Sequence, residues 1–293
     1  MAVWEKYLEY LRDQKRYAAH TVRAYQGDLL GYIEYLSEVY GIDDPAQAGT
    51  EMLRSYIVRL LEDGLSRRSV HRKVSAIKSM YRYLMRFHGL GANPAEGLVL
   101  PRPAHDLPVF LTGEAMERLL GLLPEPVDPG TARERMLLTL LYSTGMRVSE
   151  LCGLDRADVV PGRHVVRVLG KRNKQRDIPL GAALETEMER YLVWRDSVYS
   201  GEPALFVTDK GKRLYARRVY AIVHDWLGRV TTQGRRSPHV LRHTFATHML
   251  DDGADLNAIK EILGHSSLAA TQVYTHNTID QLRKVYEQAH PRA

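Results

Sequence analysis

Histidine, arginine, lysine and tyrosine residues in the second half of the chain are spaced so that they could act on a phosphate group. In SPHVLRHTFATHML, residues 237–250, His239 and Arg242 lie three residues apart and would share one face of a helix. Ser237 and Pro238 are typical of a helix start. The free N–H groups and dipole at that end favour an anion. An imidazole, a guanidinium and a helix N-terminus together predict a phosphate clamp.

A metal site built on His239 and His243 is the alternative for this stretch. Arg242 stands between the two histidines, where a metallopeptidase helix would carry an acid. No carboxylate follows at a matching spacing. We therefore expect no metal ion, and the sequence indicates no other cofactor.

The stretch STGMRVSEL, residues 143–151, predicts a turn between two helices. Thr144 and Gly145 would form the turn, and Arg147 would lie in the first turn of the second helix. Alone, such an arginine is more often a surface residue. Glu150 follows three residues later, so we expect it to brace Arg147 or another basic neighbour.

Two further stretches carry a lysine, a histidine and a tyrosine near predicted turns. Residues 164–170 and 176–180 predict a β-hairpin with Lys171 at its reversal. In LGHSSLAATQVYTH, Gly264 would end one helix, His265 would lie in the break, and Tyr274 would lie on the next helix. Each feature alone is compatible with an ordinary charged turn or a packed aromatic side chain.

A strongly basic helix is predicted in the first third of the chain. The chain carries a net charge of +6, and seven Lys or Arg but no acid lie between Ser66 and His88. At 100° per residue, six of these fall in one arc of about 140°, with Val70, Val74, Ile77, Met80, Tyr81 and Leu84 opposite. The six are Arg67, Arg68, Arg72, Lys78, Arg82 and Arg86. A solvated face normally mixes signs, so this pattern favours a polyanion partner. Arg172, Lys174 and Arg176 near the predicted hairpin turn are further candidate contacts.

Punctuation along the chain predicts two domains. Residues 1–90 read as a helical bundle, 91–108 as a proline- and glycine-rich linker, and 109–293 as a larger second domain. Hydrophobic content of 44% and charged content of 26% are typical of a soluble globular protein. No apolar run is long enough to span a membrane. The single cysteine, Cys152, excludes an internal disulfide and fits a reducing cytoplasm.

Taken together, TGMRVSEL, SPHVLRHTFATHMLDDGADL, LGHSSLAATQVYTH and the ending AHPRA resemble the tyrosine recombinases, and the bacterial Xer recombinases especially. The resemblance covers nearly the whole chain. Arg172 departs from it, because Xer proteins often have glycine there. The resemblance implies a mainly α fold with a small β-sheet in the catalytic domain, in which the two domains form a clamp around DNA. It also implies a catalytic set of Arg147, Lys171, His239, Arg242, His265 and Tyr274, with Tyr274 as the nucleophile.

The implied reaction is a transesterification on DNA that needs neither ATP nor a metal ion. A tyrosine attacks the scissile phosphodiester, forms a 3′-phosphotyrosyl bond and releases a 5′-hydroxyl, and a 5′-hydroxyl of a partner strand then attacks that bond. A phenol has a pKa of about 10 and needs a proton acceptor, for which His239 is the first candidate. Arg147, Arg242 and His265 would hold the nonbridging oxygens. Lys171 would protonate the leaving oxygen.

The resemblance also implies partners. These are a double-stranded DNA recombination site and a tetramer on two such sites, in which the predicted helix 278–289 is a protomer-exchange helix that docks into a neighbouring protomer. A second Xer-type recombinase and a septum-associated DNA translocase are further candidate partners, with resolution of chromosome dimers at cell division as the role. The alternatives left open are an integrase of a mobile element, a type IB topoisomerase-like enzyme and a DNA-binding protein without activity.

Overall fold

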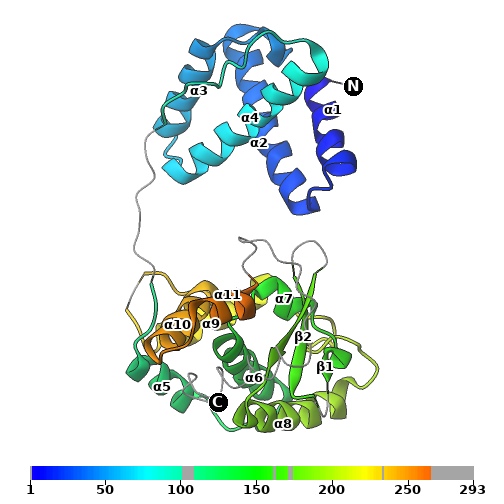
Figure 1. Cartoon of the computed structure of the whole chain (residues 1–293), viewed down its shortest axis with the longest axis vertical. Coiled ribbons are helices and arrows are strands. Elements are labelled where there is room, and N and C mark those ends of the chain that lie inside the picture. Colours follow the sequence, from blue (N-terminus) through cyan, green and yellow to red (C-terminus); the bar gives the residue numbers. More distant parts are fainter. Residues whose placement is uncertain (1, 101–108, 161–162, 171–173, 233, 265–293) are drawn as a thin grey trace. The chain divides into compact units, whose positions relative to one another are not determined.

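The computed structural model describes residues 2–100, 109–160, 163–170, 174–232 and 234–264 (Figure 1). The chain divides into two units, Met1–Asp106 and Leu107–Ala293. Both are dominated by helices, and the second contains a small antiparallel sheet. The mainly α fold class with a small sheet is therefore confirmed. Among the described residues, no helix combines the length and apolarity needed to cross a bilayer.

The first unit is helical in its described part. Its elements are α1 (Val3–Glu9), a π-helical turn η1 (Tyr10–Gln14), α2 (Ala19–Tyr40), a 3-10 turn η2 (Pro45–Gln47), α3 (Thr50–Glu62) and α4 (Arg67–His88). Helix α4 begins after Ser66, whose hydroxyl accepts a hydrogen bond from the N–H of Ser69 at 3.2 Å. Its predicted apolar residues are all buried and pack in a core with Leu29, Tyr32 and Leu36 of α2.

The second unit begins with helices and continues into the sheet. The helices are α5 (Gly113–Leu122), α6 (Pro129–Thr144) and α7 (Val148–Gly153), followed by a 3-10 turn η3 (Arg156–Asp158). The strands are β1 (Val159–Val160), β2 (Val165–Leu169) and β3 (Gln175–Pro179), in the order β1-β2-β3. Strands β2 and β3 pair antiparallel, with Val166 opposite Ile178 and Leu169 opposite Gln175. The predicted hairpin is confirmed, and β1 is an addition to it.

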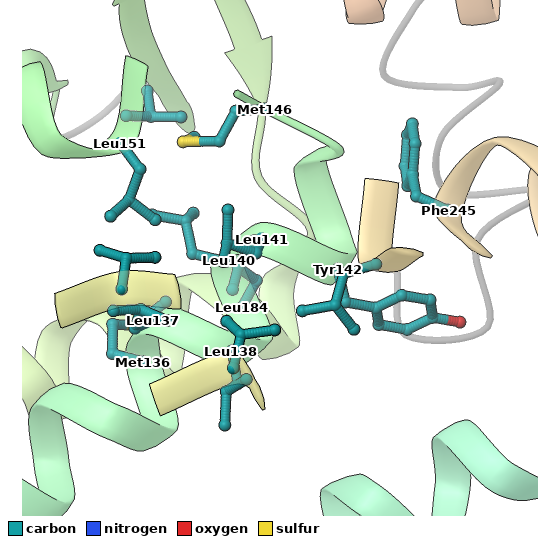
Figure 2. Packing of buried hydrophobic residues seen from close by; sticks show 14 of the residues in the cluster. Met136, Leu137, Leu138, Leu140, Leu141, Tyr142, Met146, Leu151, Leu184 and Phe245 are labelled. Atoms are coloured by element: carbon teal, nitrogen blue, oxygen red, sulfur yellow. The ribbon is translucent and has the colours of Figure 1, made fainter. Parts of the chain in front are cut away.

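Four more helices complete the described part of this unit. They are α8 (Ala182–Tyr199), α9 (Ala216–Gly228), α10 (Pro238–Asp251) and α11 (Leu256–Leu263). Helix α6 is buried from Met136 to Thr144 and packs against α8 and α10. Figure 2 shows its leucines among Leu184 of α8, Leu151 of α7 and Phe245 of α10. A helix buried on all sides is typical of the centre of a domain, and α6 therefore provides a rigid base for the turn that follows it.

Candidate active site

The turn after α6 is built on Gly145, as the sequence predicts. Gly145 has φ of +57°, in the left-handed region that glycine adopts without strain. A Cβ at this position would lie 2.5 Å from Cδ1 of Phe245 and 2.8 Å from Cδ2 of Leu263. Both the backbone conformation and the packing therefore require glycine. The tight turn brings Arg147 to the N-cap position of α7. The sequence predicts it in the first turn of that helix, so the observed place is one position earlier.

Arg147 is held by the carboxylate that follows it on α7. Its backbone N–H donates to Oε2 of Glu150 at 2.9 Å, and its Nη1 donates to Oε1 at 2.8 Å. The Glu150 side chain is 3% exposed and that of Arg147 28%. The predicted bracing role of Glu150 is confirmed. Arg147 is thus anchored on its inner side and still reaches the surface.

Arg176 differs from its expected place on a DNA-contacting surface. It lies on β3 with a side chain that is only 7% exposed. Its Nη1 and Nη2 donate to Oε1 and Oε2 of Glu150, both at 2.9 Å. On a strand, residues two apart face the same side, and Ile178 on that side is in the core. The assignment of Arg176 to the exposed DNA-contact set was therefore wrong, because the strand turns this side chain inward.

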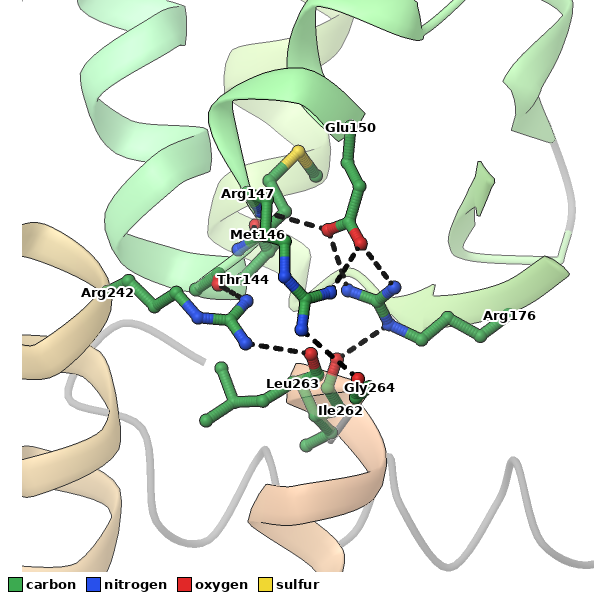
Figure 3. Close-up of polar contacts among 10 residues, drawn as sticks. Thr144, Met146, Arg147, Glu150, Arg176, Arg242, Ile262, Leu263 and Gly264 are labelled. Atoms are coloured by element: carbon green, nitrogen blue, oxygen red, sulfur yellow. Dashed lines mark hydrogen bonds and ion pairs between the residues drawn. The ribbon is translucent and has the colours of Figure 1, made fainter. Parts of the chain in front are cut away.

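The guanidiniums of three arginines meet the C-terminal end of α11 (Figure 3). Nε of Arg176 donates to the Ile262 carbonyl at 2.8 Å, and Nη2 of Arg242 donates to the Leu263 carbonyl at 2.8 Å. Nη2 of Arg147 donates to the Gly264 carbonyl at 3.1 Å. The last carbonyls of a helix have no partner within it and carry partial negative charge. These three side chains supply partners and fix the end of α11 beside α7 and β3.

The same cluster holds an excess of positive charge. Arg147, Arg176, Arg242 and Glu150 together carry three positive charges and one negative. Burial, and then the neighbouring charge of Arg147, lowers the pKa of Arg242 to about 10. Arg242 is still protonated at neutral pH. Half-buried positive charge of this kind is stabilised by an anion, so the cluster has the chemistry of a phosphate site.

His239 lies at the second position of α10, three residues before Arg242. Partial burial lowers its pKa below the usual value, and the charges of Arg242, His243 and Arg147 lower it further. The imidazole is therefore neutral at pH 7 and able to accept a proton. Ser237 is the N-cap residue, but it differs from expectation in that its side chain makes no capping hydrogen bond.

The metal alternative finds no support from carboxylates or cysteine. Within the ranges that the structure describes, no group of three or more His, Cys, Asp or Glu side chains could hold a metal ion. Cys152 is half-buried, and burial raises the pKa of its thiol to about 11. That thiol is therefore protonated at neutral pH.

Most basic residues of α4 are exposed, but two of the predicted DNA-contacting residues lie beside acids of other segments, which the sequence did not indicate. Arg67, Arg68, Arg82 and Arg86 are exposed. Arg72, which is also exposed, pairs with Asp28, a residue of α2 whose side chain is 3% exposed. Lys78 is 3.8 Å from Glu96. The face predicted to be wholly basic thus includes acids from other segments.

Near the hairpin turn, Lys174 is exposed. The remaining predicted positions, Lys171, Arg172, His265 and Tyr274, and the predicted helix 278–289 lie outside the described residues. The structure therefore brings together Arg147, His239 and Arg242 of the predicted catalytic set, and adds Arg176 and Glu150 to their surroundings.

Comparisons with known proteins give the family. Residues 109–280 match the phage integrase family, and residues 4–88 match the N-terminal SAM-like domain of phage integrases. Curated relatives named tyrosine recombinase XerC are similar over almost their whole length. The protein of Shewanella sp. (strain ANA-3) is 39% identical, covering 99% of this chain and 95% of its own. That of Mycobacterium bovis (strain BCG / Pasteur 1173P2) is 39% identical, covering 100% and 99%.

Solved structures show the same fold. A XerA recombinase is 27% identical, with a TM-score of 0.50 and coverage of 99% of both chains. A XerH site-specific recombinase bound to a palindromic difH substrate in a post-cleavage complex is 22% identical, with a TM-score of 0.71 and coverage of 98% of this chain and 81% of its own. The arginine cluster and the neutral His239 lie within the part of the chain that matches the integrase model. From these matches, the chain belongs to the phage integrase family as a site-specific tyrosine recombinase of the Xer type.

Proposed function

We propose that this recombinase resolves chromosome dimers at cell division, by cutting and rejoining two DNA sites through a 3′-phosphotyrosyl intermediate. Similarity to XerC proteins of distant bacteria extends over 93% or more of each relative and nearly all of this chain. This similarity to XerC proteins favours a chromosomal role over the integrase alternative.

The observation that carries the chemistry is the arginine cluster at the end of α11. Arg147, at the N-cap of α7, donates to the Gly264 carbonyl, and Arg242, on α10, donates to the neighbouring Leu263 carbonyl. In the proposed reaction they donate to the nonbridging oxygens of the scissile phosphate. A preorganised donor of this kind typically contributes about 3–4 kcal/mol to lowering the barrier.

Proton transfer is assigned to groups on both sides of that phosphate. Tyr274 is the proposed nucleophile, and its phenol needs a base. His239 is neutral at pH 7 because partial burial and adjacent cations lower its pKa, so it can take the phenolic proton. Lys171 is the proposed acid that protonates the leaving 5′-oxygen. His265, which follows Gly264 directly in sequence, is a proposed further donor to the phosphate.

The proposed assembly is a tetramer on two duplex sites in the cytoplasm. The exposed arginines of α4 and Lys174 near the hairpin turn would contact DNA phosphates. The helix 278–289 would dock into a neighbouring protomer. A second Xer-type recombinase and a septum-associated DNA translocase are the proposed further partners.

Capture of the covalent intermediate tests the reaction. A nicked duplex carrying the recombination site, located by footprinting, should give a protein–DNA adduct that survives denaturant. Tyr274→Phe should bind this duplex with unchanged affinity and form no adduct, because only the attacking oxygen is lost. Tyr220→Phe, at an exposed tyrosine of α9, is the matched control and should react normally. An adduct from Tyr274→Phe at the wild-type yield would overturn the assignment.

The biological role needs a separate measurement. A strain lacking the gene should accumulate unresolved chromosome dimers, and a plasmid with two sites should be resolved by the protein and its partners. Relaxation of a plasmid that lacks any site would instead indicate a topoisomerase.

A further inference from the structure

We propose that Arg176 is a positioning residue for recombination, which holds Arg147 in its reactive orientation through Glu150 and fixes the end of α11. The inference rests on the proposed function, because it takes Arg147 to be a phosphate-binding group. Arg176 cannot play that part itself, since its side chain is 7% exposed, whereas that of Arg147 is 28% exposed. Its effect must pass through the residues that it contacts.

The two arginines share Glu150 in a way that fixes all three side chains. Oε1 accepts from Nη1 of Arg147 at 2.8 Å and from Nη1 of Arg176 at 2.9 Å. Oε2 accepts from the backbone N–H of Arg147 at 2.9 Å and from Nη2 of Arg176 at 2.9 Å. Each oxygen therefore has one donor from each residue. The planar fork of Arg176 sets the rotation of the carboxylate, and the carboxylate sets the direction of Arg147.

The third donor of Arg176 ties this pair to α11. Nε donates to the Ile262 carbonyl at 2.8 Å. The helix end also lies against the guanidinium, because a Cβ at Gly264 would be 3.1 Å from Nη1 and 3.2 Å from Cζ of Arg176. One buried side chain on β3 thus contacts both α7 and the end of α11 (Figure 3).

The contacts of Arg176 join elements that are adjacent in sequence to residues of the proposed catalytic set. Helix α7 begins directly after Arg147, and Gly264, the C-cap residue of α11, is followed directly in sequence by His265. Lys171 precedes Arg176 by five residues in the sequence. Displacing a reacting group by about 1 Å can slow a reaction on the order of 100-fold. A residue that fixes three such elements relative to one another would therefore affect the rate of cleavage strongly.

The alternative is that Arg176 only neutralises a buried acid. Arg176→Lys separates the two roles, because it keeps the positive charge beside Glu150 but has neither the bidentate fork nor the reach to Ile262. Arg195→Lys is the matched control. Arg195 is 2% exposed in the same unit and donates to the Ala204 carbonyl at 2.8 Å and to Asp196 at 2.6 Å. Neither of these partners belongs to the cluster around Arg147.

The experiment measures single-turnover cleavage of the nicked site by the full chain, at saturating DNA, together with affinity for one site. Arg176→Lys should cut about 10- to 100-fold more slowly, with affinity within about twofold of wild type. Arg195→Lys should cut at the wild-type rate even if it is equally destabilised. Equal slowing in both variants, or no slowing in Arg176→Lys, would overturn the proposal.

Coupling to Arg147 shows whether the effect passes through that residue. In an Arg147→Ala background, Arg176→Lys should cause a clearly smaller fold-loss than in wild type. The same fold-loss in both backgrounds would refute the positioning role. If Arg176→Lys does not fold, the neutral pair Arg176→Gln with Glu150→Gln replaces it, with the same slow cleavage expected. Failure of the proposed reaction itself is seen separately, as an adduct formed by Tyr274→Phe.

Discussion

Replacing Gly145 with alanine tests the turn that presents Arg147. Gly145 has φ of +57°, and its carbonyl accepts a hydrogen bond from Nη1 of Arg242. A methyl group there would lie 2.5 Å from a ring carbon of Phe245 and 2.8 Å from a methyl carbon of Leu263. Both neighbours are buried, at 0% and 4% exposure. Neither can swing into solvent, so the backbone of the turn has to move.

The expected cost has two parts that can be separated. An alanine in the left-handed region costs about 1–2 kcal/mol, and forcing an extra methyl group into a packed core costs about 1–3 kcal/mol. Gly253 provides the control, since it has φ of +86° but no atom within 4 Å of a built Cβ. Gly253→Ala should therefore show the first part only. The two variants should differ by about 1–3 kcal/mol.

Urea unfolding measures this difference. In a Trp4→Phe background, Trp194 and Trp226 are the remaining tryptophans, and both belong to the second unit. Thermal unfolding is the second measurement. At roughly 2–4 °C per kcal/mol for a unit of this size, the melting temperatures of the two variants should differ by several degrees. Gly145→Ala should also slow cleavage, because it displaces the start of α7. Equal stability of Gly145→Ala and Gly253→Ala would show that the contacts with Phe245 and Leu263 relax freely, and the reasoning would fail.

Three further predictions follow from the charged groups. Burial alone would raise the pKa of Glu150, but the hydrogen bonds and charge of Arg176 and then Arg147 more than offset it and hold that pKa below the usual value. The folded state therefore binds fewer protons in acid than the unfolded state does. The ionised Glu150 contributes its full stabilisation above the unfolded pKa of about 4.3, and this stabilisation is lost as the pH falls through the lower pKa of the folded state. Unfolding of wild type should depend more steeply on pH below about 5 than that of Glu150→Gln, and equal slopes would contradict the shift. Arg68→Glu with Arg82→Glu should weaken binding to any DNA sequence and flatten its salt dependence in a gel-shift titration, whereas unchanged affinity and slope would mean that this face of α4 is only solvated. Lys171→Ala should slow cleavage, and a 5′-bridging phosphorothioate, whose leaving thiolate needs no proton, should restore much of the rate. No restoration would assign that lysine a different role.

Features set by neighbours in sequence could be predicted from the sequence alone. The start of α4 at Ser66 and its buried stripe depend on residues three and four apart. Gly145 and Gly264 end helices because they adopt left-handed conformations. The hairpin of β2 and β3 follows from alternation around a turn. Strand β1 has only two residues, which is too short for any periodic signal.

Features set by distant partners could not be predicted in the same way. Arg176 pairs with Glu150, 26 residues earlier, and Arg72 pairs with Asp28, 44 residues earlier. Neither spacing leaves a local pattern. For Arg176 a partial signal was present, since Ile178 and Leu180 alternate with it on one side of β3 and its continuation, and both are buried. The alternation with Ile178 and Leu180 indicates an inward side chain at Arg176, and it is a stronger indication than the neighbouring basic residues.

The cluster contains a single acid, Glu150, beside the three arginines, and its charge balance fits a phosphate-binding site. Two like charges about 5 Å apart repel by about 3 kcal/mol at an effective dielectric constant of 20. Without Glu150, the approach of Arg147, Arg176 and Arg242 would cost folding stability, and the lowered pKa of Arg242 reflects its burial first and then that repulsion. A second buried carboxylate would remove it, but it would also remove the excess positive charge that attracts a phosphate. The carbonyls at the end of α11 stabilise the cations through partial charges alone. They therefore make the cluster compatible with a folded protein and leave its formal charge for an anion to neutralise.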